Sequence, residues 1–543
     1  MPFPTFSPTL PEALRDAVAR HADRDFIVYG DQRLTFQDVD RASARLAKGL
    51  LSLGIGKGTC VGIVMPNAPE WILSFLAVTR IGAIATPFST LFQPRELSWV
   101  IPFADVDTLL VTRDYLGHDY VDRIERALPS LKEANDSTVF LTESPYLRRI
   151  VVWGDSDRRW SLPGPNAIHE AADREPRIDD DFLRHVEDQV VPSDRLLMIY
   201  TSGSAAAPKG VLHNHGAVIR LTHVLNEAFD FEPGDRLLPQ MPFFWLGGLN
   251  YNFFPALYNG VALVLPTSTN PGDVLDVLLR ERCDHIIGWP SQMQGLRSHP
   301  KFSQNDFSFM KPNKLGLIAP PTTTKQPGFT SGGLGMTETF GPHSRARRGA
   351  PAPTKAGAMG LEIDGIERKI VNPQTGEEAE VGEFGELLVR GYSLMDGLYK
   401  KERSEVFTRD GFYPTGDRCA IEADGYLYFD GRLGEMLKVR GANVAPIEVE
   451  LALQSMPDVQ EAGVIGVPDG SGGDMLIAVI VPAEGESPTE ESLRSALKEK
   501  VSNYKVPSRF IFRDFSELPR TGSNKLHKVE LKKRLLDGDL QGL

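Results

Sequence analysis

Strand-like and helical segments alternate along the first ninety residues of the chain. Apolar residues recur with helical or strand spacing, in the order helix, strand, helix, strand, helix and strand, at residues 10–21, 26–29, 35–50, 60–65, 71–79 and 83–87. Strands separated by helices pair in parallel, because each helix carries the chain back across the sheet. The alternation therefore predicts an α/β fold built on helix-covered parallel or mixed sheets.

Three local signals indicate where these elements begin and end. Thr35 and Asp38 have the spacing of a capping box, in which each side chain binds the backbone N–H of the other. Gly54 stands where that helix is expected to end. Asn67 is expected to cap the next helix.

The chain is long enough to form more than one domain. Its 543 residues are too many for a single hydrophobic core. Residues 154–190 are rich in Asp, Arg and Pro and predict a surface connection. Beyond about residue 435 the pattern shortens, and a helix, two strands and a helix are expected at 446–455, 459–467, 475–482 and 489–501. These elements predict a small α+β domain of roughly 110 residues.

The charge balance limits the kinds of partner. The chain has 59 Lys and Arg residues against 72 Asp and Glu residues, a net charge of −13. Nucleic acid is therefore not expected as the main partner, since its binding requires a basic surface, and nothing favours an anionic membrane. A polyphosphate ligand would have to be held by local positive charge.

Cysteine content and hydropathy point to the cytoplasm. The three cysteines are too far apart to indicate a disulfide framework or a zinc site: Cys60, Cys283 and Cys419. The first thirty residues lack the long apolar core of a signal peptide. The most apolar long stretch, residues 71–92, is interrupted by an arginine, a glycine and a proline, which predicts a buried helix and strand.

A turn rich in small residues follows the apolar strand at residues 196–199. The stretch Tyr-Thr-Ser-Gly-Ser-Ala-Ala-Ala-Pro-Lys-Gly offers several backbone amides and three hydroxyl groups, which suit anionic oxygens. It is not a P-loop of the GxxxxGK[ST] type, because Lys209 precedes Gly210 and no hydroxyl residue follows to hold magnesium. The alternative is an ordinary turn.

Four later stretches carry groups that suit a nucleotide. Residues 335–338, Gly-Met-Thr-Glu, offer a hydroxyl for a phosphate oxygen and a carboxylate for Mg²⁺. Residues 413–417, Tyr-Pro-Thr-Gly-Asp, end in a carboxylate able to accept both hydroxyls of a ribose. Residues 431–450 join the two expected domains, and residues 518–528 place Lys525 in a loop near the C-terminus. Taken one at a time, the four stretches have the alternative interpretations of a helix start, a turn, a linker and a charged tail.

In this order and spacing the motifs resemble the adenylate-forming superfamily, the acyl-CoA synthetases together with luciferases and peptide-synthetase adenylation domains. The resemblance extends from residues 34–50 to the Lys525 loop and is closest at residues 384–417. It implies a large N-terminal adenylation domain, residues 1–432, and a small mobile α+β lid, residues 433–543. It also implies ATP, Mg²⁺ and coenzyme A.

The resemblance assigns the phosphate groups of ATP to two stretches of this chain. The small-residue turn would hold the β- and γ-phosphates that leave as pyrophosphate, through Thr201, Ser202, Gly203, Ser204 and Lys209. In the second stretch, Gly335 opens the motif, Thr337 would touch the α-phosphate and Glu338 would bind Mg²⁺. Asp417 and Arg432 would hold the ribose.

Lys525 would act together with Thr337 and Glu338 in catalysis. A carboxylate attacks the α-phosphorus, so that like charges meet, and one positioned lysine with Mg²⁺ stabilises the charge that develops. In the family the C-terminal domain then rotates and the acyl-adenylate is attacked by a thiol. Gly434 occupies the hinge position, and Lys438 and Gly441 lie on the coenzyme A side.

Several positions depart from the family pattern. Ala205 and Ala206 replace a hydroxyl residue and a glycine of the phosphate loop, and a lost hydrogen bond to a charged group is worth roughly 1.5–3 kcal/mol. Leu334 replaces the aromatic residue that stacks on adenine, and Asn524 replaces the glycine before the lysine. Residues 315–333 are shorter than the corresponding stretch of relatives. These departures predict either weakened ATP binding or a loop at residues 315–333 that is disordered without ligand.

Residues 241–250, Met-Pro-Phe-Phe-Trp-Leu-Gly-Gly-Leu-Asn, fall where relatives line the acyl pocket. Phe244 and Trp245 are expected to form its wall, with Trp245 as a gate, while Gly247 and Gly248 leave room for a bulky group. The alternative is core packing, the commoner role of aromatic runs. No acidic residue matches the amino-group anchor of amino-acid-activating domains. An apolar acid, whether fatty, aromatic or polycyclic, is therefore favoured as substrate.

Three functions remain open at this stage. The first is an acid–CoA ligase, with the acid, ATP and coenzyme A as partners and a homodimer as one candidate assembly. The second is an acyl-AMP ligase that passes its product to a carrier protein, although that group typically carries an added segment where this chain is shorter. The third is an impaired binding or regulatory homologue, against which the retention of Glu338, Asp417 and Lys525 argues.

Overall fold

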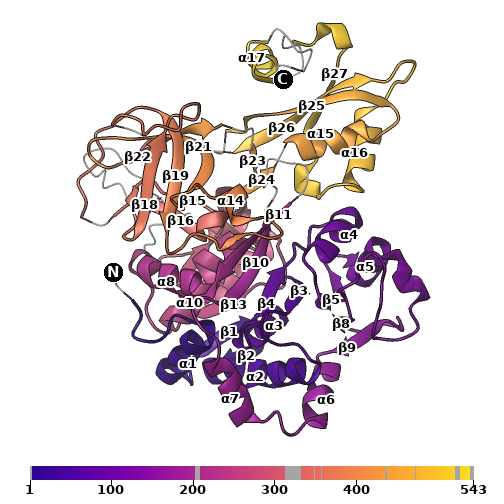
Figure 1. The fold of residues 1–543 in the computed structure, drawn as a ribbon, viewed down its shortest axis with the longest axis vertical. Helices are drawn as coiled ribbons and strands as arrows, with labels where there is room; N and C mark the ends of the chain where they lie inside the picture. Colours follow the sequence, from indigo (N-terminus) through magenta and orange to yellow (C-terminus); the bar gives the residue numbers. More distant parts are fainter. Residues whose placement is uncertain are drawn as a thin grey trace.

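The computed structural model describes most of the chain (Figure 1). It describes residues 3–201, 208–311, 332–347, 349–355, 357–433, 437–444, 446–470, 473–519, 526 and 528–538. Among these, only the backbone is described for Glu227, Pro290, Ser291, Gln294, Asp430, Gly431, Arg432, Asn443, Ile447 and Val529. No helix in these ranges is both long and apolar enough to cross a membrane.

An eight-stranded sheet forms the centre of the main body (residues 3–433), in the order β20-β11-β10-β4-β3-β5-β8-β9. Its strands are β3 Cys60–Val64, β4 Ile84–Pro87, β5 Thr108–Thr112, β8 Arg149–Trp153, β9 Ser161–Gly164, β10 Arg195–Thr201, β11 Lys209–Asn214 and β20 Gly397–Leu398. From β10 to β9 every pairing is parallel, whereas β11 is antiparallel to both of its neighbours. The expected helix-covered, mostly parallel sheet is confirmed.

A second sheet of five strands lies beside the first, in the order β14-β12-β13-β1-β2. Its strands are β1 Asp25–Tyr29, β2 Gln32–Thr35, β12 Arg236–Pro239, β13 Ala262–Leu265 and β14 His285–Ile287. Only β2 runs antiparallel to its neighbour, so this sheet is mixed.

Helices surround the two sheets (Figure 1). They are α1 Leu10–His21, α2 Phe36–Ser52, α3 Pro69–Arg80, α4 Pro94–Phe103, α5 Tyr120–Ala127, α6 Asn166–Arg174, α7 Asp180–Asp188, α8 His215–Leu225, α9 Leu246–Gly248, α10 Phe254–Asn259, α11 Pro271–Arg280, α12 Pro290–Ser298, α13 Pro300–Gln304 and α14 Arg403–Val406. Shorter turns are η1 Pro129–Glu133, η2 Asn226–Ala228, the π-helical η3 Leu249–Phe253 and η4 Thr337–Thr339.

Smaller antiparallel sheets complete the main body. They comprise β6 Asp114–Tyr115 with β7 His118–Asp119; β15 Leu334–Met336, β16 Gly341–Arg345 and β17 Leu361–Glu362; and β18 Ile366–Val371, β19 Gly385–Gly391, β21 Tyr413–Ile421 and β22 Leu427–Arg432. The last four-stranded sheet carries the Tyr-Pro-Thr-Gly-Asp motif on β21.

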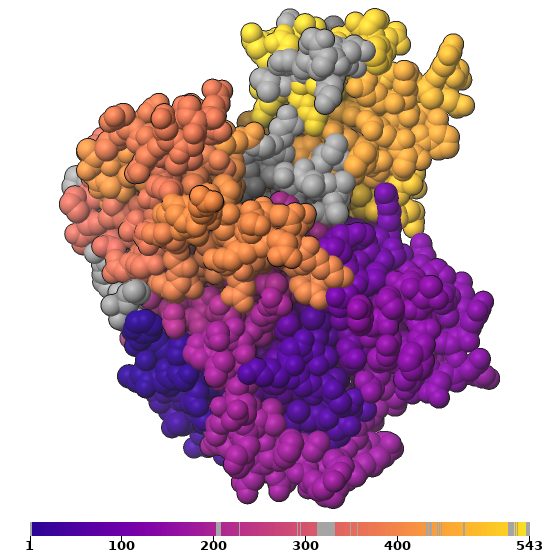
Figure 2. Space-filling model, viewed as in Figure 1, coloured from indigo at the N-terminus to yellow at the C-terminus, as the bar shows by residue number. Residues whose placement is uncertain are grey.

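The C-terminal lobe (residues 437–538) rests on the main body above α4 (Figures 1 and 2). It contains β23 Leu437–Val439, β24 Ala442–Val444, α15 Pro446–Gln454, β25 Val459–Pro468, β26 Asp474–Pro482, α16 Glu490–Lys498, η5 Asn503–Lys505, β27 Arg509–Phe512, η6 Phe515–Glu517 and α17 Lys528–Leu536. The α+β character and element order expected from the sequence are confirmed. The domain boundary at residues 432 and 433 remains a prediction.

Two expectations about local structure are wrong. Asn67 does not cap α3, whose N-cap is Ala68; its side chain instead accepts from Phe243 N–H at 2.7 Å and donates to the Met241 carbonyl at 2.9 Å. Residues 154–190 are more than a connection, since they form β9, α6 and α7. α6 packs so closely on α2 that a Cβ at Gly49 would lie 2.0 Å from the Ile168 carbonyl oxygen.

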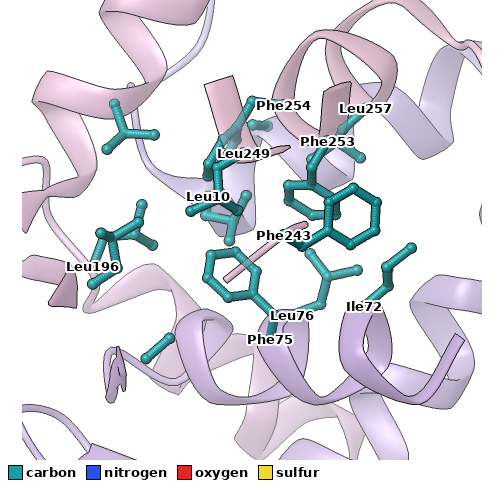
Figure 3. Close-up of a cluster of buried hydrophobic side chains, with 14 of the residues drawn as sticks. Leu10, Ile72, Phe75, Leu76, Leu196, Phe243, Leu249, Phe253, Phe254 and Leu257 are labelled. Carbon is teal, nitrogen blue, oxygen red and sulfur yellow. The ribbon is translucent and has the colours of Figure 1, made fainter. Parts of the chain in front are cut away.

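The largest hydrophobic core lies between α3 and the segment that follows β12 (Figure 3). Ile72, Phe75 and Leu76 of α3 face Phe243 and the aromatic side chains of η3 and α10. The rings of Phe75 and Phe253 meet edge-on, with centroids 5.4 Å apart. The segment expected to line an acyl pocket is thus anchored from behind by the core.

Replacing Arg80 with methionine is expected to lower the free energy of unfolding of the main body by about 3–5 kcal/mol. The buried Arg80 guanidinium pairs with Glu187 at 2.6 Å and Asp40 at 2.9 Å. Its loss removes the shorter ion pair of the buried Glu187 carboxylate, which keeps a longer pair with Arg15 at 3.4 Å. Urea unfolding measures the change.

A matched exposed arginine provides the control for this prediction. Arg45 pairs with Asp173 at 3.2 Å, but the two side chains are 53% and 66% exposed. Replacing Arg45 with methionine should therefore cost less than about 1 kcal/mol. An equal cost for the two variants would show that the buried network does not stabilise the packing of α7.

Candidate functional site

The small-residue turn connects two antiparallel strands of the central sheet. Thr201 ends β10 and pairs in register with Lys209, the first residue of β11. Ser202, Gly203 and Ser204, with the two alanines that follow them, lie outside the described residues. The described strands show that both ends of the turn belong to the sheet.

The Thr337–Glu338 turn is held against β11 by a buried histidine. His213 of β11 donates from Nε2 to the Thr337 carbonyl oxygen over 2.7 Å. Burial lowers the pKa of His213 to about 4, so the ring is neutral at pH 7 and its single proton can make this bond. Strand β11, which follows the small-residue turn, therefore also positions the residues expected at the α-phosphate and Mg²⁺.

Glycine at position 335 is required by the same turn. A Cβ there would lie 2.4 Å from the Gly341 carbonyl oxygen, a separation that no side chain allows. Glu338 accepts a hydrogen bond from the Tyr413 hydroxyl at 3.2 Å, and its own carbonyl oxygen accepts from Met395 N–H at 2.8 Å. The backbone and the carboxylate of Glu338 are thus both oriented.

Strand β21 joins this turn to the expected ribose site. It carries Tyr413 at its start and the buried Asp417 near its middle. Asp417 pairs in register with Arg432 of β22, which puts the two residues expected at the ribose side by side. The structure therefore connects the Thr337–Glu338 turn to β11, which follows the small-residue turn, and to β21, which carries Asp417.

Magnesium requires little protein structure at such a site. No group of three or more His, Cys, Asp or Glu side chains in the described parts of the chain could hold a metal ion. Mg²⁺ is usually held by one or two carboxylates together with substrate phosphates and water. The single oriented carboxylate of Glu338 fits this mode of binding.

The expected acyl-pocket residues divide between the core and the domain interface. Phe244 is buried, whereas Trp245 is half-buried and meets the ring of Tyr504 from the C-terminal lobe edge-on, with centroids 5.8 Å apart. Core packing therefore accounts for Phe243 and Leu249 but not for the outward ring of Trp245.

The two glycines do not leave the open space expected of them. A Cβ at Gly248 would lie 2.0 Å from the Pro242 carbonyl oxygen, so this glycine permits a close backbone contact. A Cβ at Gly247 would lie 3.0 Å from Met241 Sδ and from Cη2 of Trp289. The space beside Gly247 is already filled by these two side chains.

Trp289 has a position in the site that sequence patterns did not indicate. It stands at the N-terminus of α12, between Gly247 on one side and Gly441 of the C-terminal lobe on the other. A Cβ at Gly441 would lie 2.7 Å from Cδ2 of Trp289, and Gly441 has a φ of +84°. The β23–β24 hairpin thus approaches the acyl side through a residue that must be glycine.

Lys438 lies on the same hairpin with an exposed side chain, and its N–H donates to Asp474 at 2.7 Å. The residues beside Lys525 lie elsewhere in the lobe. Leu526 packs where a Cβ at Gly463 would be, and Lys528 Nζ pairs with Glu450 at 2.7 Å. Lys525 and Gly434, like Asn524 and most of the shortened 315–333 segment, lie outside the described residues.

Comparison with known proteins places the chain in a family. Residues 14–399 match the model of AMP-binding enzymes, and residues 448–525 match that of the AMP-binding enzyme C-terminal domain. The chain is 29% identical to a feruloyl-CoA synthase from an Amycolatopsis species over 513 residues, 93% of this chain and 95% of that one. It is 27% identical to an indoleacetate–CoA ligase from Aromatoleum aromaticum over 529 residues, 96% of this chain and 97% of that one.

The fold agrees with these matches. The solved structure of an amide bond synthetase from Marinactinospora thermotolerans aligns with a TM-score of 0.74 at 22% identity, covering 97% of this chain and 99% of that one. Both family models match in the expected order, and the relatives match over nearly their whole length. The chain therefore belongs to the AMP-binding family of adenylate-forming enzymes and is homologous to acyl- and aryl-CoA ligases.

Proposed function

We propose that this protein is an acid–CoA ligase of the AMP-forming type. It would join an apolar carboxylic acid to the α-phosphate of ATP with release of pyrophosphate, and then transfer the acyl group from AMP to the thiol of coenzyme A. The observation that carries the proposal is that the Thr337–Glu338 turn is bonded both to β11, which follows the small-residue turn, and to β21, which carries Asp417. The homology to CoA ligases along almost the whole chain supports it.

Each proposed site residue has a role that its chemical type allows. The backbone of the 201–209 turn and Lys209 would hold the departing phosphates, with Thr337 at the α-phosphate. Asp417, next to Arg432, would accept the ribose hydroxyls. Mg²⁺ held at Glu338 would supply charge neutralisation on the phosphates. In this way the polyphosphate is attracted locally by a protein whose net charge is −13.

The substrate proposed is an apolar acid, with an aromatic acid favoured. Phe244, Trp245 and Trp289 provide aromatic surface on the acyl side, and the space beside Gly247 is filled. A planar ring can stack or meet such side chains edge-on. The names of two relatives, a feruloyl-CoA synthase and an indoleacetate–CoA ligase, agree with this choice.

The lobe is proposed to be in the arrangement for acyl transfer. Its β23–β24 hairpin, which carries Lys438 and Gly441, faces the acyl side at Trp289. Leu526 and Lys528, the described neighbours of Lys525, pack instead on β25 and α15, and α17 lies at the end of the lobe away from the main body (Figure 1). Adenylation would require the lobe to turn so that Lys525 enters the site.

Release of AMP with a panel of carboxylic acids, with and without coenzyme A, tests the proposed function. A CoA ligase releases AMP and forms a thioester only when coenzyme A is present. An acyl-AMP ligase retains acyl-AMP when coenzyme A is added, and an impaired homologue forms neither product. We further propose that the enzyme acts in the cytoplasm as a protein whose partners are the acid, ATP and coenzyme A.

Replacing Trp245 with alanine is expected to shift the preferred acid toward bulkier molecules by roughly tenfold in kcat/KM while the KM for ATP stays unchanged. The ring is half-buried and faces the lobe, so its loss opens the acyl side without leaving a large core cavity. The measurement is kcat/KM for a short and a bulky acid.

Replacing Trp245 with phenylalanine is the matched control, since it keeps a ring facing Tyr504. It should shift the acid profile less than alanine does. An unchanged profile in the alanine variant, together with a loss of stability of about 3–5 kcal/mol, would assign Trp245 to packing alone.

A further inference from the structure

A short segment of the C-terminal lobe docks on the main body through buried polar groups. The segment Ser502–Lys505 contains η5, and Ser502 and Lys505 are 0% and 1% exposed. Lys505 Nζ lies 2.9 Å from Glu96 Oε1 on α4, and the Ser502 hydroxyl lies 3.0 Å and 2.8 Å from the two Glu96 oxygens. One carboxylate of the main body therefore accepts hydrogen bonds from two side chains of the lobe.

Glu96 is oriented for this contact by its own helix. Its Oε2 accepts from Gln93 N–H at 2.9 Å in the capping box that begins α4. The side chain is 7% exposed, so little water reaches the carboxylate. Because the capping hydrogen bond already orients this carboxylate, it loses little conformational entropy when the lobe docks on it.

Lys505 keeps a partner on its own lobe. Its Nζ lies 2.8 Å from Glu448 Oε1 of α15, so Lys505 and Glu448 travel together as a neutral pair when the lobe moves. Burial alone would lower the pKa of Lys505, but Tyr504, Glu96 and Glu448 together raise it. The ammonium is therefore charged at pH 7, and its charge is shared between two carboxylates.

The contact discriminates between orientations of the lobe. The side chains of this ion pair are 2% and 7% exposed, so the pair is strong only when the two charges are in contact. Keeping the carboxylate buried without its cation would be strongly unfavourable in free energy. Turning the lobe would separate Glu96 from Lys505 and let water hydrate Glu96, while Lys505 keeps Glu448. The pair across the interface thus exists only in the present arrangement.

The same segment reaches the acyl side of the site. Tyr504, between the two docking residues, meets Trp245 edge-on with ring centroids 5.8 Å apart. A cavity of about 180 Å³ lies beside Glu96 and is also lined by Trp99 and by Pro208 from the end of the phosphate turn. Docking at Glu96 is therefore coupled by contact to the acyl side, and the cavity beside Glu96 extends to Pro208.

We propose that Glu96 and Lys505 are positioning residues for acyl transfer to coenzyme A. Their buried ion pair holds the C-terminal lobe in the orientation that presents the β23–β24 hairpin to the site, and it is broken when the lobe turns for adenylation. This inference rests on the proposed acid–CoA ligase function. Neither residue touches the reacting atoms.

The test is Glu96→Gln, assayed in each half-reaction separately. Glutamine with its carbonyl oxygen at the Oε2 position still accepts from Gln93 N–H and from the Ser502 hydroxyl, so helix α4 is preserved while the charge is lost. Transfer from supplied acyl-AMP to coenzyme A should slow by roughly tenfold or more, whereas acyl-AMP formation should change less than about twofold. Lys505→Arg, which keeps the charge, should retain more of the transfer rate than Lys505→Gln.

An exposed ion pair across the same interface provides the control. Arg126 and Glu499 lie 3.1 Å apart, with side chains 52% and 66% exposed. Because exposed pairs contribute little, Glu499→Gln should leave both half-reactions unchanged. Equal effects of Glu96→Gln and Glu499→Gln on acyl transfer would overturn the proposal.

A second measurement detects the orientation of the C-terminal lobe independently of catalysis. Cysteines introduced at Arg126 and Glu499 can be joined by a short bismaleimide, and the three native cysteines of the chain are buried. Cross-linking should be slower when Glu96→Gln is added, at an unchanged unfolding temperature. Unchanged cross-linking, or an equal loss of both half-reactions, contradicts the proposed role of the Glu96–Lys505 pair. Absence of AMP release by the unmodified enzyme with every acid would instead contradict the proposed function, and the cross-linking result would still stand.

Discussion

Replacing Lys525 with alanine is expected to slow acyl-AMP formation by roughly 10²–10³-fold, the usual loss when one preorganised donor to a developing charge is removed. Transfer of supplied acyl-AMP to coenzyme A should remain within about twofold of the unmodified rate. The reason is that the segment beside Lys525 packs away from the main body in the present arrangement, through Leu526 on β25 and Lys528 on Glu450. Single-turnover assays of the two half-reactions measure both rates.

Lys533→Ala is the matched control for this experiment. Lys533 lies on α17, a few residues further along the chain, and its side chain is exposed. Its loss should leave both half-reactions unchanged. If Lys525→Ala instead slows both half-reactions to the same extent in a folded protein, Lys525 does not act in adenylation alone and the two-orientation assignment is wrong.

Replacing Gly434 with proline should have the opposite effect. Proline fixes φ near about −65° and removes an N–H, so a hinge at this position would lose the freedom to turn. Acyl-AMP should still form, while thioester formation should fall by roughly 10²-fold or more, because the β23–β24 hairpin that begins at Leu437 can no longer reach Trp289. The measurement is accumulation of acyl-AMP in the presence of coenzyme A.

Gly434→Ala separates loss of rotation from loss of the glycine itself. Alanine keeps the N–H and most of the allowed backbone region, so the rate of acyl transfer should fall much less than with proline. Loss of acyl-AMP formation in the proline variant, at an unchanged unfolding temperature, would place the hinge elsewhere. Normal thioester formation by the proline variant would also place the hinge elsewhere.

Local structure was predictable wherever short-range periodicity and caps determine it. The helix opened by Thr35 and Asp38 is present as α2 with both hydrogen bonds of its capping box. In the C-terminal lobe, α15, β25, β26 and α16 lie within a few residues of their expected positions. These elements follow from apolar spacing within ten to twenty residues, which a sequence displays directly.

Motif order, and not a local pattern, predicted which residues form the nucleotide site, and these assignments remain predictions. Thr337, Glu338 and Asp417 were expected together, and the structure links their strands through His213 and Tyr413. Neither linking residue was singled out beforehand, because a lone histidine or tyrosine in a strand has no distinguishing local pattern. The two linking residues contact partners 124 and 75 positions away along the chain, so their roles depend on the packing of distant elements.

Asn67 and the two glycines show how a local signal can mislead. A cap was expected at Asn67 because asparagine precedes a helical pattern, yet its amide holds the segment that begins at Met241. Gly247 and Gly248 suggested open space, but Trp289 and the Pro242 carbonyl occupy it. The sequence shows that a side chain is absent, whereas the tertiary structure decides what fills the vacated volume.

By itself, the sequence determined the α/β architecture and the family, and it predicted the residue types around ATP, because periodicity and motif order are properties of the chain alone. Only the tertiary structure decided how the lobe meets the main body. The Glu96–Lys505 pair joins residues 409 positions apart, and Gly441 approaches Trp289 from another sheet. Such contacts are selected by the packing of whole elements and by burial of charge, and no local pattern specifies them.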